Sequence, residues 1–298
     1  MVPALYKRDR SQEKTLRYSE IRPGPPLSDA IRCIWVVRGT PDQGPAPDPV
    51  VPDGCVEIVL NFAEPFEQLL GTRRVRQPLA MIVGQSTRPV VIQPTASVDL
   101  VGIRFHPWAA HLLLRIPVGE LRDQLVPLED VRSFIRPDLL EAAATACTTA
   151  ARLALLMQSL QAALANARPV AGEHHALAQL VQLVVGNTAT ASVRELSART
   201  GHGMRSIQRL FETHVGVAPK TLMRIARVQR ALRMAQLSPT MSWTTIGARA
   251  GYFDQSHLIR DFRALVGCVP SDFRAADDSM THALLERPVG ALASSSRT

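Results

Sequence analysis

Two stretches of the chain carry nearly the same residues: Ser192-Val-Arg-Glu-Leu-Ser-Ala-Arg-Thr-Gly201 and, fifty positions later, Ser242-Trp-Thr-Thr-Ile-Gly-Ala-Arg-Ala-Gly251. They share the first serine, the Ala-Arg pair and the closing glycine. After one inserted residue the similarity resumes at an offset of fifty-one, and it pairs Arg209 with Arg260, Phe211 with Phe262, Val215-Gly216 with Val266-Gly267, and Pro219 with Pro270. The last third of the chain therefore contains two copies of one unit.

Each copy has the pattern of a helix, a glycine turn and a second helix. In the first copy, apolar residues precede Gly201, which can adopt the positive φ that ends a helix. Ile207, Leu210 and Phe211 then resume the 3.6-residue apolar spacing. The second copy repeats this arrangement around Gly251. Each copy therefore predicts a helix-turn-helix.

If the apolar residues of the second helix in each copy are buried, the opposite face of that helix is polar and exposed. Arginine pairs bidentately with guanine in the major groove, and glutamine pairs with adenine. Arginines on an exposed helix can instead serve solubility alone, but the duplication favours DNA reading. The candidate base-reading residues are Met204, Arg205, Ser206, Gln208 and Arg209 in the first copy and Gln255, Ser256, His257, Arg260 and Arg263 in the second.

The charge of the chain supports DNA as the partner. Residues 192–274 hold thirteen Lys and Arg against five Asp and Glu, a net charge of +8 that equals the net charge of the whole chain. Five of these cations lie between the copies, where residues 219–237 contain no glycine and predict one linking helix opened by Pro219. We expect Lys220 and Arg224 of this helix to contact DNA phosphates.

The second copy carries a resemblance to a known family. The run from Ile246 to Arg263, Ile-Gly-Ala-Arg-Ala-Gly-Tyr-Phe-Asp-Gln-Ser-His-Leu-Ile-Arg-Asp-Phe-Arg, and the following Gly267-Cys-Val-Pro-Ser-Asp-Phe-Arg274 resemble AraC-type transcriptional regulators. The resemblance covers residues 172–275, and it implies two helix-turn-helix units joined by a long helix. It departs from the family pattern at packing positions, which are Gly247, Tyr252, Leu258 and Val269.

The first part of the chain has the pattern of a small β domain, a partial barrel. Five segments are short, rich in β-branched and aromatic residues, and bounded by turn formers; they are 31–37, 56–62, 81–83, 89–92 and 98–105. Two short runs, Val51-Pro-Asp-Gly-Cys55 and Gly102-Ile-Arg-Phe-His-Pro107, resemble one group of AraC-type N-terminal sensor domains. From the residues alone, Asp53-Gly54 predicts a hairpin turn.

From Pro107 onwards the pattern is helical, with a long alanine- and leucine-rich stretch over residues 137–165. Its leucine stripe is either a dimer interface or a face that packs on its own domain. The overall expectation is an α+β chain with a β-rich sensor domain and helical extension over 1–166, a linker over 167–173, an all-α DNA-binding domain over 174–275 and a flexible tail over 276–298.

Other functional classes find less support. Cys33, Cys55, Cys147 and Cys268 have no CxxC spacing, the histidines have no carboxylate at coordinating spacing, and no nucleophile elbow, P-loop or GxGxxG turn is present. We therefore expect no enzyme activity, cofactor or metal; the alternatives are a metal-dependent small-molecule enzyme and a DNA-repair protein that uses the same helix-turn-helix domain.

Location and partners complete these expectations. The chain has no apolar run that could span a bilayer, and Met1 to Tyr18 lack the core of a signal peptide, so we expect a cytoplasmic protein without a membrane partner. The expected partner is duplex DNA. RNA polymerase, an unidentified small-molecule effector and a second copy of the chain are further candidates.

Overall fold

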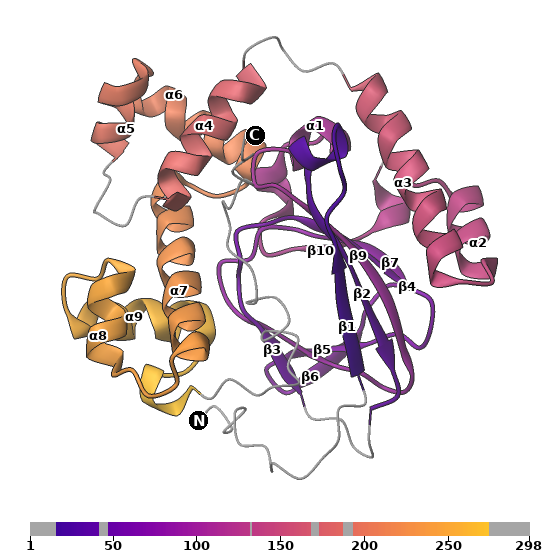
Figure 1. Cartoon of the computed structure of the whole chain (residues 1–298), viewed down its shortest axis with the longest axis horizontal. Helices are drawn as coiled ribbons and strands as arrows, with labels where there is room; N and C mark the ends of the chain where they lie inside the picture. The colour runs from indigo at the N-terminus through magenta and orange to yellow at the C-terminus, as the bar shows by residue number, and fades with distance from the viewer. Residues whose placement is uncertain (1–15, 42–46, 132, 168–172, 187–192, 274–298) are drawn as a thin grey trace, which may run out of the picture.

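A computed structural model describes residues 16–41, 47–131, 133–167, 173–186 and 193–273. It has the expected α+β architecture, with a sheet-rich N-terminal domain and an all-helical C-terminal domain (Figure 1). Most of the predicted linker, the predicted tail and residues 1–15 lie outside the described residues.

The N-terminal domain contains two open antiparallel sheets rather than a closed barrel. The larger sheet has the order β1 (Leu16–Ile21), β2 (Ile31–Gly39), β9 (Val98–Phe105), β4 (Glu57–Asn61), β7 (Ala80–Val83) and β10 (Leu125–Pro127). The smaller sheet has the order β3 (Asp48–Val50), β8 (Val90–Gln93), β5 (Glu67–Leu70) and β6 (Arg73–Arg76). Trp35, Met81 and Leu100 of the larger sheet share one buried cluster with Phe66 and Ile92 from the smaller sheet's side.

All five predicted strands are present, as β2, β4, β7, β8 and β9. The strands that the sequence did not single out are short or polar: β5 and β6 read Glu-Gln-Leu-Leu and Arg-Arg-Val-Arg. Such segments carry no clear apolar alternation, and they are strands only because a neighbouring strand pairs with them.

The prediction of a hairpin turn at Asp53-Gly54 is wrong. This turn connects β3 to β4, and these two strands lie in different sheets and do not pair with each other. Gly54 does have the positive φ of a tight turn, +82°. The chain uses this conformation to cross from one sheet to the other, and it touches the C-terminal domain on the way.

Helices cover one side of the larger sheet: α1 (Ala110–Leu114), α2 (Pro137–Thr145) and α3 (Thr149–Asn166), with short 3-10 turns η1 (Leu27–Asp29), η2 (Val118–Leu121) and η3 (Leu128–Asp130). The single helical stretch expected over 137–165 is two helices, because the chain is extended at Ala146 and Thr148 caps α3 by accepting a hydrogen bond from the Ala151 amide, 3.1 Å away. Leu153, Leu156 and Leu160 pack into the core of their own domain. Among the described helices, none is long and apolar enough to cross a membrane.

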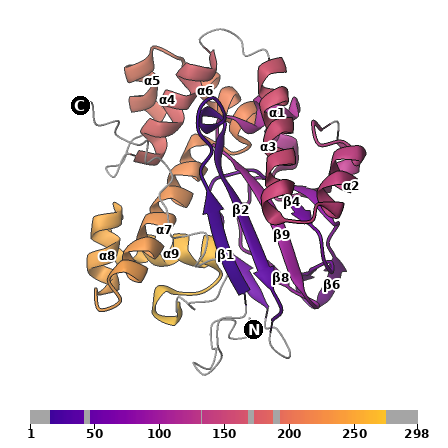
Figure 2. The same ribbon diagram turned by 45° about the vertical axis from the view of Figure 1, so that its right-hand side comes forward.

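The C-terminal domain holds the two predicted helix-turn-helix units. Helix α4 (Glu173–Gly186) precedes the first unit, which is α5 (Val193–Thr200) and α6 (Met204–Leu210) with a following π-helical turn, η4 (Phe211–Val215). The second unit is α8 (Trp243–Ala250) and α9 (Gln255–Val266), followed by the 3-10 turn η5 (Pro270–Asp272). The linking helix α7 (Pro219–Leu237) has the predicted bounds, and the units lie at its opposite ends (Figures 1 and 2).

Backbone geometry confirms the repeat. The turn glycines Gly201 and Gly251 have φ of +70° and +90°, and Gly216 and Gly267, which end the second helical segments, have φ of +91° and +90°. Phe211 and Phe262 are both fully buried. The units differ in that α9 is one continuous helix, whereas α6 passes into the π-helical turn.

The two units are packed differently against the N-terminal domain. Phe211, Val215 and Val217 of the first unit share one continuous core with Ile58 and Ile103 of the larger sheet. The second unit has its own core around Ile246, Leu258 and Phe262, and Val51 of the N-terminal domain contributes to it. The N-terminal domain is therefore in direct contact with both units.

Candidate nucleic-acid interface

The second helix of the first unit presents a polar surface beside a buried apolar stripe. Ile207 and Phe211 face the core and anchor the helix. All five candidate base-reading residues of this unit are exposed: Met204, Arg205, Ser206, Gln208 and Arg209. Nothing in the described residues covers this face, so α6 can approach a flat or grooved partner along its length.

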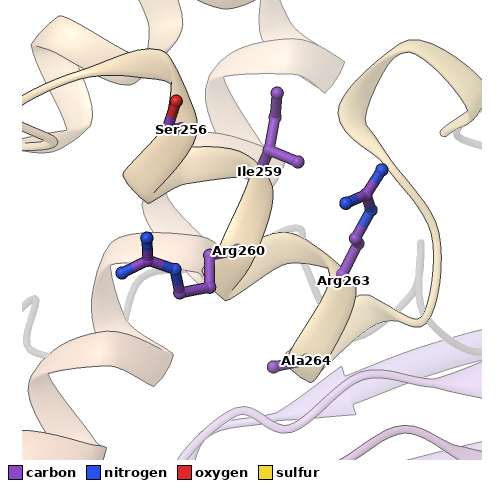
Figure 3. A pocket seen from close by; sticks show the side chains of 5 residues that line it. All are labelled: Ser256, Ile259, Arg260, Arg263 and Ala264. Atoms are coloured by element: carbon purple, nitrogen blue, oxygen red, sulfur yellow. The ribbon is translucent and has the colours of Figure 1, made fainter.

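In the second unit, α9 is built in the same way. Asp254 caps its N-terminus, with Oδ1 accepting a hydrogen bond from the His257 amide at 2.7 Å, and Leu258 and Phe262 are buried. Gln255, Ser256, Arg260 and Arg263 are exposed. Ser256, Arg260 and Arg263, with Ile259 and Ala264, line an open hollow of about 700 Å³ on this helix (Figure 3).

His257 lies differently from the outward position expected for it. Its ring packs edge-on against Tyr252, with centroids 5.1 Å apart, and its Nε2 is 3.6 Å from Oδ2 of Asp261 one turn further along α9. The Asp261 side chain is only 3% exposed. The sequence did not indicate that Asp261 is buried. An aspartate four residues after His257 on a helix is ordinarily a solvent-exposed partner, and here α7 covers it.

Arg224 and Arg227 of α7 supply that cover. The Nε of Arg224 donates to Oδ1 of Asp261 at 2.7 Å, and Nη2 of Arg227 lies 3.5 Å from Oδ2 of the same residue. Arg224 was expected to contact phosphate; its side chain is 33% exposed, and its hydrogen bond to Asp261 joins α7 to α9. Lys220, the other expected phosphate contact, is exposed at the start of α7.

Arg230 has a comparable internal role. Its Nη1 donates to the carbonyl of Ala250 at the end of α8, and its Nη2 donates to the carbonyl of Val185 in α4, both at 3.0 Å. Burial lowers the pKa of this guanidinium from its usual value. Arg230 thus joins α4 and α8 to α7.

Phe253 is an exposed residue that the sequence reasoning did not select. Its side chain is 92% exposed, and it stands between the turn glycine of the second unit and the N-cap Asp254. The residues at the start of a reading helix are those that reach base edges. The sequence could have indicated Phe253, because it is a phenylalanine at a position outside the apolar spacing that forms the core of the unit.

The interior of the N-terminal domain contains a cluster of buried charges, which we call the Arg104 cluster: Arg104, Arg32, Asp53, Glu57 and Glu20. The Arg104 side chain is 1% exposed; its Nε donates a hydrogen bond to Oε1 of Glu57 and lies 3.3 Å from Oδ2 of Asp53. Nη1 of Arg32 is 3.6 Å from the same Asp53 oxygen. Burial raises the pKa of Glu57, and it raises the pKa of the nearby thiols of Cys33 and Cys55 to about 12.

The histidines considered as metal ligands make other contacts. His106 stacks on Trp108 and its Nε2 is 3.2 Å from the carbonyl of Ser28, while Nδ1 of His111 is 2.7 Å from the carbonyl of Ile116. In the described part of the chain, no three His, Cys, Asp or Glu side chains are placed to hold a metal ion together.

Comparison with known proteins divides the chain in the same way as the fold. Residues 196–276 match the family described as a helix-turn-helix domain. Residues 19–127 match a domain of unknown function, DUF6597. No curated protein matches the sequence of the chain.

Several solved structures resemble the chain distantly. ToxT from Vibrio cholerae is 8% identical with a TM-score of 0.45, and the match covers 87% of this chain and 97% of that one. ToxT with a bound unsaturated fatty acid is 10% identical with a TM-score of 0.43, covering 89% and 96%. The AraC-like transcriptional activator CuxR is 12% identical with a TM-score of 0.28, covering 79% and 84%. Similarities this low do not transfer a ligand or a mechanism.

Proposed function

We propose that this chain, a DNA-binding transcription regulator with an AraC-type helix-turn-helix domain, reads DNA with α6 and α9 together. We further propose that an effector or partner at the N-terminal domain controls this reading. The observation that carries the proposal is the pair of equivalent units at opposite ends of α7, each with an exposed polar second helix.

The length of α7 supports simultaneous binding by both units. Its 19 residues span about 28 Å at 1.5 Å per residue. Successive major-groove faces on one side of B-DNA are about 34 Å apart. Because α6 precedes the start of α7 and α9 packs against Arg224 and Arg227 on its side, a connector of this length is compatible with two adjacent grooves on one face of the duplex.

The side chains on the two helices suit different tasks. In the first unit, Arg205 and Arg209 stand one turn apart and are both exposed, which favours guanine edges. In the second unit, Arg260 stands one turn from Ser256, whose short hydroxyl reaches little beyond phosphate. Gln255, at the start of α9, can pair with adenine. We assign base discrimination mainly to α6, and positioning mainly to α9 together with Lys220.

Control through the N-terminal domain is supported by the way the domains share their cores. The described residues of the first unit share one core with the larger sheet. A ligand that repacks the N-terminal domain would therefore act on the first unit directly. A small-molecule effector, RNA polymerase and a second copy of the chain are the proposed partners, and the effector's identity is open.

The experiment is to incubate the full-length chain with fragmented genomic DNA and to sequence the retained duplexes. The proposal expects enrichment of fragments that share two short segments about 10 base pairs apart, one for each reading helix. An Arg205→Ala/Arg260→Ala double variant should lose this enrichment, while a variant at Arg76, an exposed cation of the N-terminal domain, should keep it. Retained DNA with the composition of the input would overturn the proposal.

A further inference from the structure

The N-terminal domain touches both units where their second helical segments end. A Cβ placed on Gly216 would lie 2.8 Å from Cγ1 of Val118 and 3.2 Å from Cγ of Gln85. A Cβ placed on Gly267, the equivalent glycine of the second unit, would lie 3.3 Å from Cγ of Pro89. The same point of each unit thus rests on the N-terminal domain, which can fix how the two units are placed relative to one another.

A third contact lies between these two, on α7 itself. The side chain of Gln229 is buried in α7, and its Nε2 donates a hydrogen bond to the carbonyl of Pro52 at 2.6 Å. A Cβ on Gly54 would be only 2.8 Å from Cδ1 of Leu222 and 3.8 Å from Cγ2 of Ile225. Leu222, Ile225 and Gln229 share one face of the helix, so the Pro52–Gly54 turn is seated along α7.

The other side of the Pro52–Gly54 turn is bound to the interior of its own domain. Asp53, at the centre of the turn, is held by Arg104 and Arg32 of the Arg104 cluster. The carbonyl of Gly54 accepts a hydrogen bond from Nε2 of Gln85 at 2.6 Å. The Gln85 side chain is fully buried and lies next to Gly216 of the first unit, since a Cβ added there would be 3.2 Å from its Cγ. Movement of the turn would therefore displace both the buried charges and α7.

Two buried atoms indicate that the cluster is not fully satisfied. Among the described residues, Nη2 of Arg104 and Oδ2 of Asp53 have no hydrogen-bond partner, although Oδ2 lies near both guanidinium groups. A buried polar network with unmet bonds is sensitive to any added charge or hydrogen-bond partner. Such a change would act on the carboxylate of Asp53, which belongs to the turn that contacts α7.

We propose that the Pro52–Gly54 turn is a positioning element for DNA reading, which sets the distance and mutual angle of α6 and α9 by holding α7 to the Arg104 cluster. This rests on the proposed function, because it presumes that both helices read one duplex. Gln229, Gly54 and Asp53 are positioning residues, and none of them touches DNA. A change in the charge or hydrogen bonding of the Arg104 cluster shifts the turn, and with it the spacing at which the two helices bind.

The first test uses duplexes that the full-length chain has selected from a random pool, remade with one base pair inserted or deleted between the two contacted segments. The wild-type chain should lose about tenfold or more in affinity for each altered spacing. Gln229→Leu removes the hydrogen bond to Pro52. For this variant, the loss of affinity at each altered spacing should be only about threefold or less. Gln236→Leu is the matched control, because Gln236 lies two turns further along α7 and its Nε2 has no hydrogen-bond partner in the described part of the chain; it should keep the wild-type profile.

The second test is hydrogen exchange measured without DNA. In Gln229→Leu, backbone amides should exchange faster both at residues 51–55 and at residues 222–229, whereas Gln236→Leu should leave residues 51–55 unchanged. Should Gln229→Leu fail to fold, Val51→Ala weakens the same contact from the side of the turn.

The outcomes separate the two proposals. A wild-type spacing profile in a folded Gln229→Leu variant overturns the positioning role, since a merely structural residue would weaken all spacings equally. If the wild-type chain selects no duplex, the proposed function is wrong. The contact between the Pro52–Gly54 turn and α7 is then tested by hydrogen exchange alone. Unchanged exchange at residues 51–55 in Gln229→Leu would overturn it.

Discussion

The amide of Gln229 in α7 donates a hydrogen bond to the backbone carbonyl of Pro52, 2.6 Å away across 177 residues of sequence, and both groups are buried. A buried carbonyl that loses its donor costs about 1–3 kcal/mol, so this bond holds the two domains in a defined register. The helix that separates the two reading helices is thereby in direct contact with the N-terminal domain, and DNA reading and the state of that domain become physically linked.

DNA binding should depend steeply on salt. The net charge of the chain resides in its C-terminal domain, and log K is expected to fall by about 0.9 per neutralised phosphate for each tenfold rise in salt. Lys220→Ala should reduce this slope by about 1. Arg76→Ala, which alters an exposed cation of β6, should leave the slope unchanged. Titration of a selected duplex at several salt concentrations measures both, and an affinity indifferent to salt would contradict the prediction.

Truncation of the two equivalent phenylalanines should have different consequences. Phe211→Ala and Phe262→Ala each remove a fully buried ring and should cost about 3–5 kcal/mol. Phe211 lies in the core shared with the N-terminal sheet, so its loss should loosen both domains, whereas Phe262 packs against Trp243 and Phe273 and its loss should loosen the second unit alone. Hydrogen exchange by region distinguishes the two patterns.

Phe253→Ala provides the matched control for this comparison, because the Phe253 ring is exposed and its removal leaves no cavity. Its stability should equal that of the wild-type chain. Retained stability in Phe211→Ala and Phe262→Ala as well would show that the assigned helical register is wrong.

Arg205 and Ser256 should differ in what they contribute to binding. Arg205→Ala should relax the preference at one or two base pairs, each worth about 1–3 kcal/mol, because it removes a bidentate donor from the exposed face of α6. Ser256→Ala should weaken all sites similarly and modestly, since a serine on this face reaches phosphate. Binding to single-base variants of a selected duplex decides between the roles. If Ser256→Ala changes the preference and Arg205→Ala does not, the assignment is reversed.

Phe253 should contact DNA through its exposed ring. An apolar side chain at the start of a reading helix can pack on the methyl group of thymine, so Phe253→Ala should weaken binding by about 1 kcal/mol at sites with thymine under this residue. Replacing each thymine of a selected duplex by uracil removes the methyl group. This change should weaken the wild-type chain at one position and leave Phe253→Ala unaffected there.

The control for this prediction is Leu237→Ala. Leu237 is also strongly exposed, but it lies at the end of α7 away from the start of either reading helix. Its substitution should alter neither affinity nor the response to uracil. Identical binding of all duplexes by Phe253→Ala and the wild-type chain would remove Phe253 from the interface.

The C-terminal domain could be predicted from its residues alone, down to the bounds of α7 and the positive φ of the turn glycines. These features are local: the apolar spacing of a helix, the freedom of Gly201 and Gly251, and the duplication of a unit fifty residues long are all written within short windows of the chain. The stronger strands of the N-terminal sheets could be predicted for the same reason.

Which charged and polar residues face solvent, and which face the protein, depends on how distant segments of the chain pack together. Arg224 and His257 were expected on the DNA-facing surface, and each keeps about a third of its side chain exposed, but the structure also places both against Asp261, which is buried where α7 packs on α9. Asp53-Gly54 looked like a hairpin turn, and it became a contact with α7 because β3 and β4 joined different sheets. These outcomes depend on which distant segments pack together, and no short window of sequence records the burial or the partners that this packing creates.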